Sequence, residues 1–489
     1  MATEVFMVGG VDVTAPLADP LFGVEALPLG ACATLFKQCN KGKLKGRSFE
    51  VAKIHGIDEK TDLHALAERI RQVAVEKYRA LLQDQKYRVE GYIFIYAGGP
   101  QTRNAVWGKT HALDDVPRLL YCMERLELIS QLDNWVHSSP PEEDRGGARE
   151  EILNFVDDPS KRLLSLTGRK LSALPDIFAL SPFKRLRTLD LRINRLEVLP
   201  PSIGALRKLE TLSLACNCLE VLPKQIGKLG KLVRLDLSTN RLQELPVEMG
   251  QLGQLTLLIL VDNGLTALPD EFKKLQSLKF LNLGCNRLSQ LPAVIPQLLS
   301  LRELKLDRNL LSIGLDAIGK LVNLKVLDIH NNRMPKFPLA WGNLRHLETL
   351  DVSQNGLFSL PLEIGGLEKL TTLEANMNRL SHLPDEICHL TNLSRLSLFT
   401  NALESLPEPL GCLRALTELD VDFNLLTELP HSIANLTALK WLSAAFNRLS
   451  ELPEGIEELP ELQSVNVVQN CIQTLHPSLP NREGLEITI

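Results

Sequence analysis

An asparagine recurs every 23 residues along most of this 489-residue sequence, without one insertion or deletion. A frame of leucines accompanies each asparagine and reads L-x-x-L-x-L-x-x-N-x-L-x-x-L-P, as in residues 186–200. We number the frame from its first leucine, which places the asparagine at position 9. The series consists of Asn194, Asn217, Asn240, Asn263, Asn286, Asn309, Asn332, Asn355, Asn378, Asn401, Asn424, Asn447 and Asn470. A fixed period of this length predicts identical structural units, each stacked on its neighbours.

The leucine frame also predicts the structure of each unit. Leucines at positions 4 and 6 face inward from a short strand, and positions 3, 5 and 7 face the opposite side. The asparagine amide can bond backbone groups of a neighbouring coil that would otherwise stay unpaired, so each asparagine is expected to be buried against the next coil. A degenerate first coil carries Arg169 in the asparagine slot. The sequence therefore predicts a right-handed leucine-rich repeat solenoid of about fourteen coils.

The first part of the chain has a different pattern. We expect strands at 49–54 and 89–96 with a long helix at 62–85 between them, which is typical of a parallel βαβ unit. A second helix is expected at 114–136, and the apolar opening segment at 5–13 is expected to add an edge strand. The fold class is therefore α/β. The expected organisation is a small α/β domain at 1–137, a linker at 138–159, the solenoid at 160–477 and a C-terminal tail at 478–489.

Composition excludes several classes of protein. The net charge is −5, which argues against a nucleic-acid partner. No apolar run approaches the roughly 18–20 residues needed to span a bilayer. The first thirty residues contain no lysine or arginine, which argues against a signal peptide. The nine cysteines are scattered rather than clustered at the ends of the array. We therefore expect a cytoplasmic protein with reduced thiols.

The chain carries no recognisable catalytic, cofactor or metal motif, and we expect a non-enzymatic protein without a cofactor or a small-molecule substrate. Gly108-Lys109-Thr110 follows an apolar strand, but Arg103 stands where a phosphate-binding loop requires glycine. His382, Cys388 and His389 lack the spacing of a tetrahedral metal site.

The surface left for function is the inner face of the sheet, where side chains are not needed for the core. Position 5 carries a stripe of acids, and position 10 carries a row of arginines that could pair with them laterally. Large apolar side chains on a surface that need not be apolar suggest partner contacts. One apolar spot contains Leu257, Ile259 and Phe280. A second, predicted to be nearly continuous, contains Phe399, Phe423, Trp441 and Phe446 beside Asp420 and Asp422.

The repeat unit L-P-x-x-I-G-x-L-x-x-L-x-x-L-x-L-x-x-N-x-L is nearly intact at 199–219 and at 222–242. It resembles the intracellular leucine-rich repeats of the Ras-pathway scaffold group, which includes plant intracellular Ras-group proteins and the Scribble and Erbin family. The resemblance covers about two-thirds of the chain. It implies a cytosolic scaffold whose concave face binds a protein, such as a small GTPase or a phosphatase. The chain differs from these relatives because no PDZ domain follows the array.

We therefore expect a scaffold or adaptor that holds a protein partner on the concave face, in intracellular signalling. Two alternatives stay open. One is an architectural subunit of a large assembly such as an axoneme, in which the partner is another subunit. The other is a repeat receptor linked to an enzymatic N-terminal domain of unrecognised type.

Overall fold

The computed structural model describes residues 4–6, 32–39, 48–55, 89–97, 104–110, 128–129, 131–473 and 484–488. These residues fall into two compact units. The first comprises 1–141, 145–159 and 177–184, and the second comprises 142–144, 160–176 and 185–489.

The first unit contains a five-stranded sheet. Its strands are β1 (Glu4–Phe6), β2 (Cys32–Cys39), β3 (Ser48–His55), β4 (Val89–Ala97) and β5 (Asn104–Thr110), in the order β3-β2-β1-β4-β5. The two predicted strands are confirmed as β3 and β4. They run in the same direction, because β2 pairs antiparallel with both, but they are not neighbours. The prediction of an edge strand at the opening segment is wrong, because β1 pairs with both β2 and β4 and lies inside the sheet. The predicted helix at 62–85 lies outside the described residues.

The sequence pattern did not predict two further elements of the first unit, strand β5 and helix α3 (Arg145–Asp157). The glycine-lysine-threonine segment at 108–110 belongs to strand β5, which pairs with β4 along its whole length and so forms no loop around a phosphate. Helix α3 lies within the segment that the sequence suggests is a linker. One face of α3 is buried, and Phe155 stacks on Phe183 with ring centroids 5.8 Å apart. Of the predicted helix at 114–136, residues 128–129 and 131–136 are described and helical.

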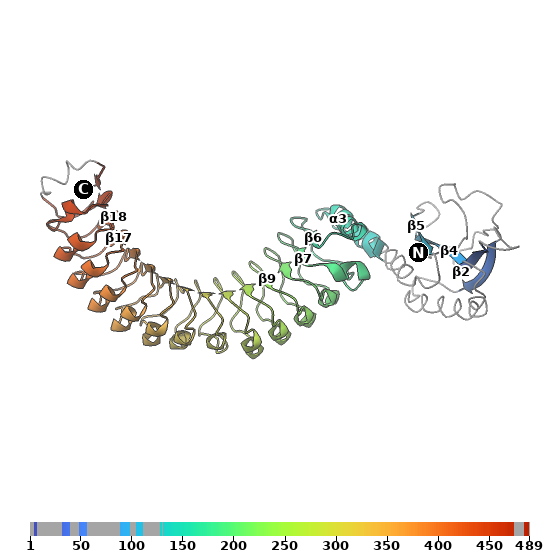
Figure 1. The fold of residues 1–489 in the computed structure, drawn as a ribbon, viewed down its shortest axis with the longest axis horizontal. Coiled ribbons are helices and arrows are strands. Elements are labelled where there is room, and N and C mark those ends of the chain that lie inside the picture. Colours follow the sequence, from blue (N-terminus) through green and yellow to red (C-terminus); the bar gives the residue numbers. More distant parts are fainter. Residues whose placement is uncertain are drawn as a thin grey trace. The chain divides into compact units, whose positions relative to one another are not determined.

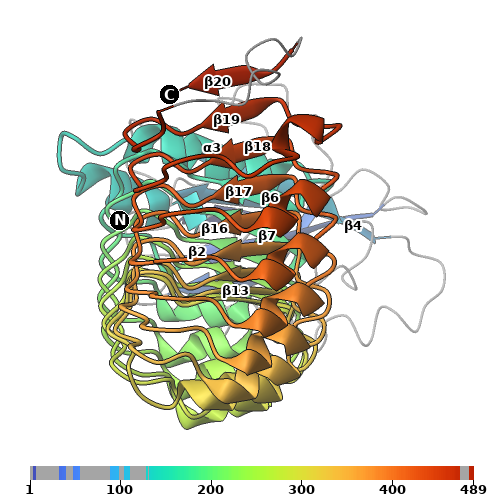
Figure 2. The same cartoon turned by 90° about the vertical axis from the view of Figure 1, so that its left-hand side faces the viewer.

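The second unit is the predicted solenoid. Fifteen parallel strands form one continuous sheet along the inner edge of a curved array (Figures 1 and 2). The predicted fold class is confirmed. Beyond the fourteen expected coils, the C-terminal residues add strand β20, which pairs with β19. The strands are β6 (Leu163–Ser165), β7 (Thr188–Asp190), β8 (Thr211–Ser213), β9 (Arg234–Asp236), β10 (Leu257–Ile259), β11 (Phe280–Asn282), β12 (Glu303–Lys305), β13 (Val326–Asp328), β14 (Thr349–Asp351), β15 (Thr372–Glu374), β16 (Arg395–Ser397), β17 (Glu418–Asp420), β18 (Trp441–Ser443), β19 (Ser464–Asn466) and β20 (Glu486–Thr488).

A short 3-10 helix forms the outer side of almost every coil. The turns pack so closely that a Cβ added to Gly227 would lie 2.3 Å from the carbonyl oxygen of Glu248 in the next coil, which explains the glycine of the I-G pair. These helices are η2 (Ser181–Arg185), η3 (Pro201–Ala205), η4 (Lys224–Lys228), η5 (Val247–Gln251), η6 (Asp270–Lys274), η7 (Ile295–Gln297), η8 (Leu315–Lys320), η9 (Leu339–Asn343), η10 (Leu362–Gly366), η11 (Asp385–His389), η12 (Glu408–Cys412), η13 (His431–Asn435) and η14 (Ile456–Glu458).

Asparagine hydrogen bonds join consecutive coils. The side-chain nitrogen of Asn286 donates to Leu283 O in its own coil and to Leu260 O in the preceding coil, both at 2.9 Å. Its side-chain oxygen accepts the Leu265 amide of the preceding coil at 3.1 Å. The expected direction of these bonds is therefore wrong, because they reach the preceding coil and not the next one. Asn470 in the last asparagine coil consequently makes the same set of bonds as its counterparts.

The irregular coils near residues 313 and 335 leave the sheet intact. Strands β12, β13 and β14 pair in regular register, as the unbroken period predicts. Gly314 adopts a left-handed conformation (φ 80°) and starts the longer helix η8. The asparagine of the following coil differs from its counterparts: the side-chain oxygen of Asn355 is buried and has no hydrogen-bond partner.

We predict that Asn286→Ala lowers the free energy of unfolding by about 2–4 kcal/mol, because it leaves buried backbone groups of two coils unpaired. Asn355→Ala is the matched control. Asn355 makes equivalent bonds through its nitrogen, but its oxygen has no partner. Its loss should therefore be about 1 kcal/mol smaller. Urea denaturation followed by circular dichroism measures both values, and equal losses would contradict this account of the acceptor bond.

Candidate functional site

The inner face of the sheet presents three side chains per coil. Leucines at positions 4 and 6, such as Leu419 and its equivalents, are almost fully buried, whereas positions 3, 5 and 7 are mostly half-buried or exposed. Because neighbouring strands pair in register at a period of 23 residues, equivalent positions form rows along the sheet. The composition of these rows therefore determines what the inner face can bind.

The residues of the first predicted apolar spot lie on the neighbouring strands β10 and β11. Leu257 pairs in register with Phe280 on the neighbouring strand, and Ile259 lies on the same strand as Leu257. All three side chains are half-buried on the inner face. None of the three is among the exposed large hydrophobic side chains, whereas Phe423, Trp441 and Phe446 are.

Three phenylalanines near the C-terminal end form an aromatic ladder, which we define as Phe399, Phe423 and Phe446. The rings of Phe423 and Phe446 are stacked, with centroids 4.1 Å apart and planes 8° apart. Phe399 meets Phe423 edge-on at 5.3 Å. Phe423 and Phe446 each remain 44 % exposed, which is unusual for two stacked phenyl rings.

Trp441 lies apart from the aromatic ladder. It occupies position 3 of strand β18, five residues before Phe446, and among the described residues no ring contact joins it to the aromatic ladder. Its register partner is Glu418 on β17, and 45 % of its surface is exposed. The second apolar spot thus consists of two aromatic parts, one on each side of Asp420, Asp422 and Ser443, rather than one continuous patch.

Asp420 and Asp422, which we call the carboxylate pair, lie between these aromatic parts. Asp422 accepts hydrogen bonds from the Ser443 hydroxyl at 2.7 Å and from the Ala445 amide at 2.6 Å. Asp420 accepts the Asp422 amide at 3.1 Å. Burial raises the pKa of both carboxyls, and these hydrogen bonds offset only part of that rise. Among the described residues, no basic side chain forms an ion pair with either carboxylate.

Other acids on the same face are paired, but not by the predicted arginine row. Arg395 places its guanidinium between Glu374 at 2.7 Å and Glu418 at 2.5 Å. Asp190 is paired with Arg192 at 2.7 Å. The cations of these pairs come from positions 3 and 7, and Lys305 at position 5 lies 3.5 Å from Glu303. The position-10 arginines described in ion or ring contacts turn elsewhere, as Arg195 does toward Glu142 and Arg379 toward the ring of Phe358.

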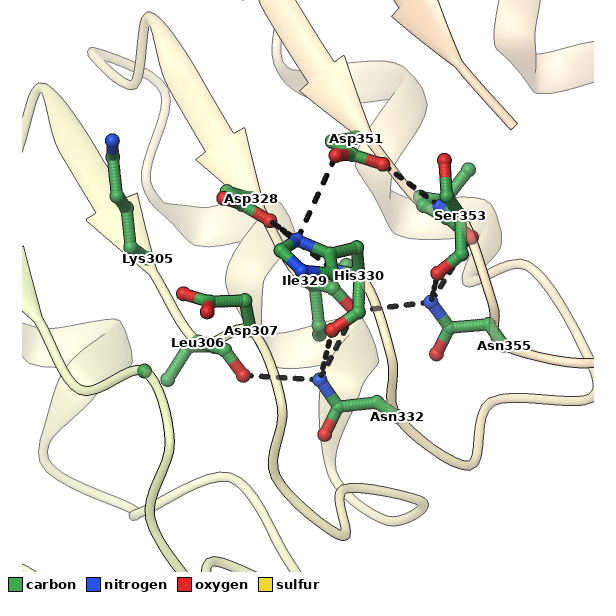
Figure 3. A network of polar contacts seen from close by, with 12 residues as sticks. Lys305, Leu306, Asp307, Asp328, Ile329, His330, Asn332, Asp351, Ser353 and Asn355 are labelled. Atoms are coloured by element: carbon green, nitrogen blue, oxygen red, sulfur yellow. Dashed lines mark hydrogen bonds and ion pairs between the residues drawn. The ribbon is translucent and has the colours of Figure 1, made fainter. Parts of the chain in front are cut away.

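A histidine cluster that sequence reasoning missed lies near the middle of the sheet (Figure 3). His330 Nδ1 lies 2.8 Å from Asp328 and 3.7 Å from Asp351. One ligand atom from each residue falls within 4.8 Å of the others, which is compact enough for a metal ion. A histidine hydrogen-bonded to a carboxylate explains the same geometry, so the cluster alone does not indicate a metal. The sequence signal was the frame itself, since position 7 of a coil lies near position 5 of the same coil and of the next one.

The left-handed backbone at position 8 holds the rings of Phe423 and Phe446. Both have φ of 53°, and each coil from Ile193 to Gln469 repeats this conformation without using glycine. Most side chains adopt it reluctantly, whereas asparagine tolerates it. Asn331 occupies the equivalent place in its coil with φ 54°. The two exposed rings therefore stand on a backbone turn that favours other residue types.

Comparison with known proteins supports the architecture. The family description "Leucine-rich repeat region" matches residues 301–423, and "Leucine rich repeat" matches 184–242 and 253–311. A leucine-rich repeat protein from Leptospira interrogans is 33 % identical over 69 % of this chain and 92 % of its own, with a TM-score of 0.64. YopM from Yersinia pestis is 26 % identical over 74 % of this chain and 99 % of its own, with a TM-score of 0.55.

A third similar structure is a plant peptide hormone receptor, RGFR1, in complex with RGF2. It is 26 % identical over 66 % of this chain and 61 % of its own, with a TM-score of 0.51. A comparison with curated proteins finds no match. Within the part of the chain that the structure describes, no helix is long and apolar enough to cross a membrane.

We predict that Phe423→Asn leaves the melting temperature within about 3 °C of wild type, because relief of the left-handed backbone offsets the lost ring contacts. Thr400→Asn is the matched control. Thr400 has the same backbone conformation (φ 55°) but no ring to lose, so its replacement should raise the melting temperature. Differential scanning calorimetry measures both. A large loss of stability in Phe423→Asn alone would show that the aromatic ladder is mainly structural.

We also predict that Asp420→Asn/Asp422→Asn is more stable than wild type at pH 7. The folded-state pKa of each carboxyl is raised above its unfolded value, so the charged forms oppose folding and protonation relieves this cost. Neighbouring charges shift the pKa of Asp420 in opposite directions: Arg395 lowers it and Glu374 raises it. The advantage of the variant should shrink as pH falls through the raised pKa values and vanish near about pH 4. A variant less stable than wild type at every pH would contradict this.

Proposed function

Because the chain belongs to the leucine-rich repeat family, we propose that it is a non-enzymatic scaffold that holds a protein partner on its inner sheet. The observation that carries this proposal is the exposure of Trp441, Phe423 and Phe446 on one sheet face at 44–45 %. Burial of exposed aromatic rings is the usual source of binding energy at protein interfaces. The core does not need these rings, because the leucines below them are already buried.

The C-terminal part of the inner face is the better candidate for the contact. Its aromatic residues stand beside carboxylates that lack a cation, whereas the acids of Asp190 and Glu374 are neutralised by arginines of the same chain. The spot around Leu257 is half-buried and carries no charged side chain of its own on strand β10. A partner would therefore bury more new surface at β17 and β18.

We place this scaffold in the cytoplasm and in intracellular signalling. The resemblance of residues 199–242 to the repeats of Ras-group proteins supports a role in intracellular signalling. The six described cysteines are unpaired, as expected in a reducing compartment. A small GTPase would fit a signalling role, whereas a subunit of a large assembly would fit an architectural one. The identity of the bound protein decides between them.

Site-specific photo-crosslinking tests the proposed surface. Benzoylphenylalanine placed at Phe423 of the full chain in cells should yield covalent adducts with one or a few proteins. The matched control is Phe358, whose ring is 53 % exposed beyond the sheet. Adducts from position 358 and none from position 423 would contradict a partner on the inner face.

With the crosslinked partner in hand, we predict that Trp441→Ala weakens its binding at least tenfold, because a large exposed ring contributes a few kcal/mol when buried. Leu257→Ala should change the affinity by less than about threefold. Isothermal titration calorimetry measures both, and circular dichroism checks that the variants are folded. If Leu257→Ala abolishes binding and Trp441→Ala does not, the partner contacts the first apolar spot instead.

A further inference from the structure

The charge of the solenoid changes along its length. Residues 186–300 contain 14 basic and 10 acidic side chains, a net charge of +4. Residues 347–473 contain 6 basic and 18 acidic side chains, a net charge of −12. The C-terminal part of the array, residues 347–473, therefore attracts cationic partners and repels nucleic acids and anionic membranes. Whatever binds the exposed aromatic rings must approach through this negative potential.

The inner face already contains one example of how it binds a cation. Arg395 bridges Glu374 and Glu418, two carboxylates on neighbouring strands, through separate guanidinium nitrogens. Planar guanidinium groups suit such two-point contacts better than a lysine ammonium does. The carboxylate pair continues this row of acids along the sheet, but its hydrogen-bond donors are backbone amides and serine hydroxyls. An equivalent cation for Asp420 and Asp422 is not supplied by the described part of the chain.

The residues beside the carboxylate pair add a preference for arginine. Phe399 and Ala445 occupy position 7 in the coils on either side of Asp422, and the stacked rings of Phe423 and Phe446 follow at position 8. Trp441 stands beside Glu418 in the strand register. Each aromatic part is thus adjacent to a carboxylate. A guanidinium can stack on an aromatic face while its edge donates hydrogen bonds to a carboxylate, which combines two favourable interactions.

Resting on the function proposed above, we propose that the partner presents an extended, arginine-rich segment to strands β17 and β18. One arginine bonds the carboxylate pair beside the aromatic ladder, and a second stacks on the exposed ring of Trp441. Ser443, whose short side chain is half-buried, lies between these two contacts. Charge complementarity favours this occupant, because residues 347–473 carry a net charge of −12.

Binding of designed peptides to the full chain tests the proposal. Three fluorescein-labelled peptides of twelve residues alternate glycine with arginine, lysine or citrulline, and fluorescence anisotropy measures their affinity. The arginine peptide should bind several-fold more tightly than the lysine peptide, and the citrulline peptide should not bind. Raising the NaCl concentration from 50 to 500 mM should weaken binding several-fold, because the carboxylate contacts are partly screened.

Variants locate the binding site. Asp420→Asn/Asp422→Asn should weaken the arginine peptide at least tenfold, and Phe423→Asn should remove most of the preference for arginine over lysine. The matched control is Asp236→Asn/Asp262→Asn, which also removes two carboxylates, one of them from position 5, and should leave binding unchanged. Equal effects of the two double variants, or equal binding of the arginine and lysine peptides, would overturn the proposal.

The outcomes distinguish failure of the arginine contact from failure of the proposed scaffold function. A crosslinked partner that needs Trp441 but is insensitive to Asp420→Asn/Asp422→Asn would refute the arginine contact and keep the inner face as the binding surface. Specific arginine-peptide binding with no protein adduct at Phe423 would instead support the chemistry of the site and contradict the proposed scaffold.

Discussion

The asparagine hydrogen bonds between consecutive coils are the interaction on which the rest of the second unit depends. A coil of 23 residues leaves backbone groups on its inner turn that the next strand cannot reach. The amide at position 9 bonds them to the coil before it, as Asn286 does for Leu260 and Leu265. Because every coil is tied in the same way, the strands stay in register and equivalent side chains form straight rows.

This division of roles leaves the inner face available for binding. Leucines and asparagines hold each coil, so positions 3, 5 and 7 contribute little to the core. Near the N-terminal end these positions form internal ion pairs, as in Asp190 with Arg192. Near the C-terminal end they carry Asp420 and Asp422, whose half-buried carboxyls have raised pKa values, and the exposed ring of Trp441. Residues that oppose folding and lie together on one surface are more easily explained by binding than by structure.

Much of the fold followed from local pattern. The leucine frame predicted the parallel sheet, the buried positions and the survival of the sheet through the irregular coils. Pattern could not reveal that the asparagine bonds point to the preceding coil, since either direction satisfies the same spacing. Helix α3 was missed because its segment is rich in charge and glycine, although Ile152 and Phe155 are buried. Strand β20 was missed because no repeat frame marks it.

The sequence by itself determined the period, the core and which side chains reach the inner face, because these depend on residues close together in the chain. Only the tertiary structure decided which of those side chains meet. Phe423 and Phe446 stack because equivalent left-handed turns, 23 residues apart, orient both rings in the same direction. These turns contain no glycine, so the sequence gives no sign of the left-handed backbone. Trp441 does not join that stack, because it is the first residue of strand β18, whereas Phe446 comes after the end of the same strand. Contacts between coils depend on backbone direction at each turn, and residue spacing alone does not specify that direction.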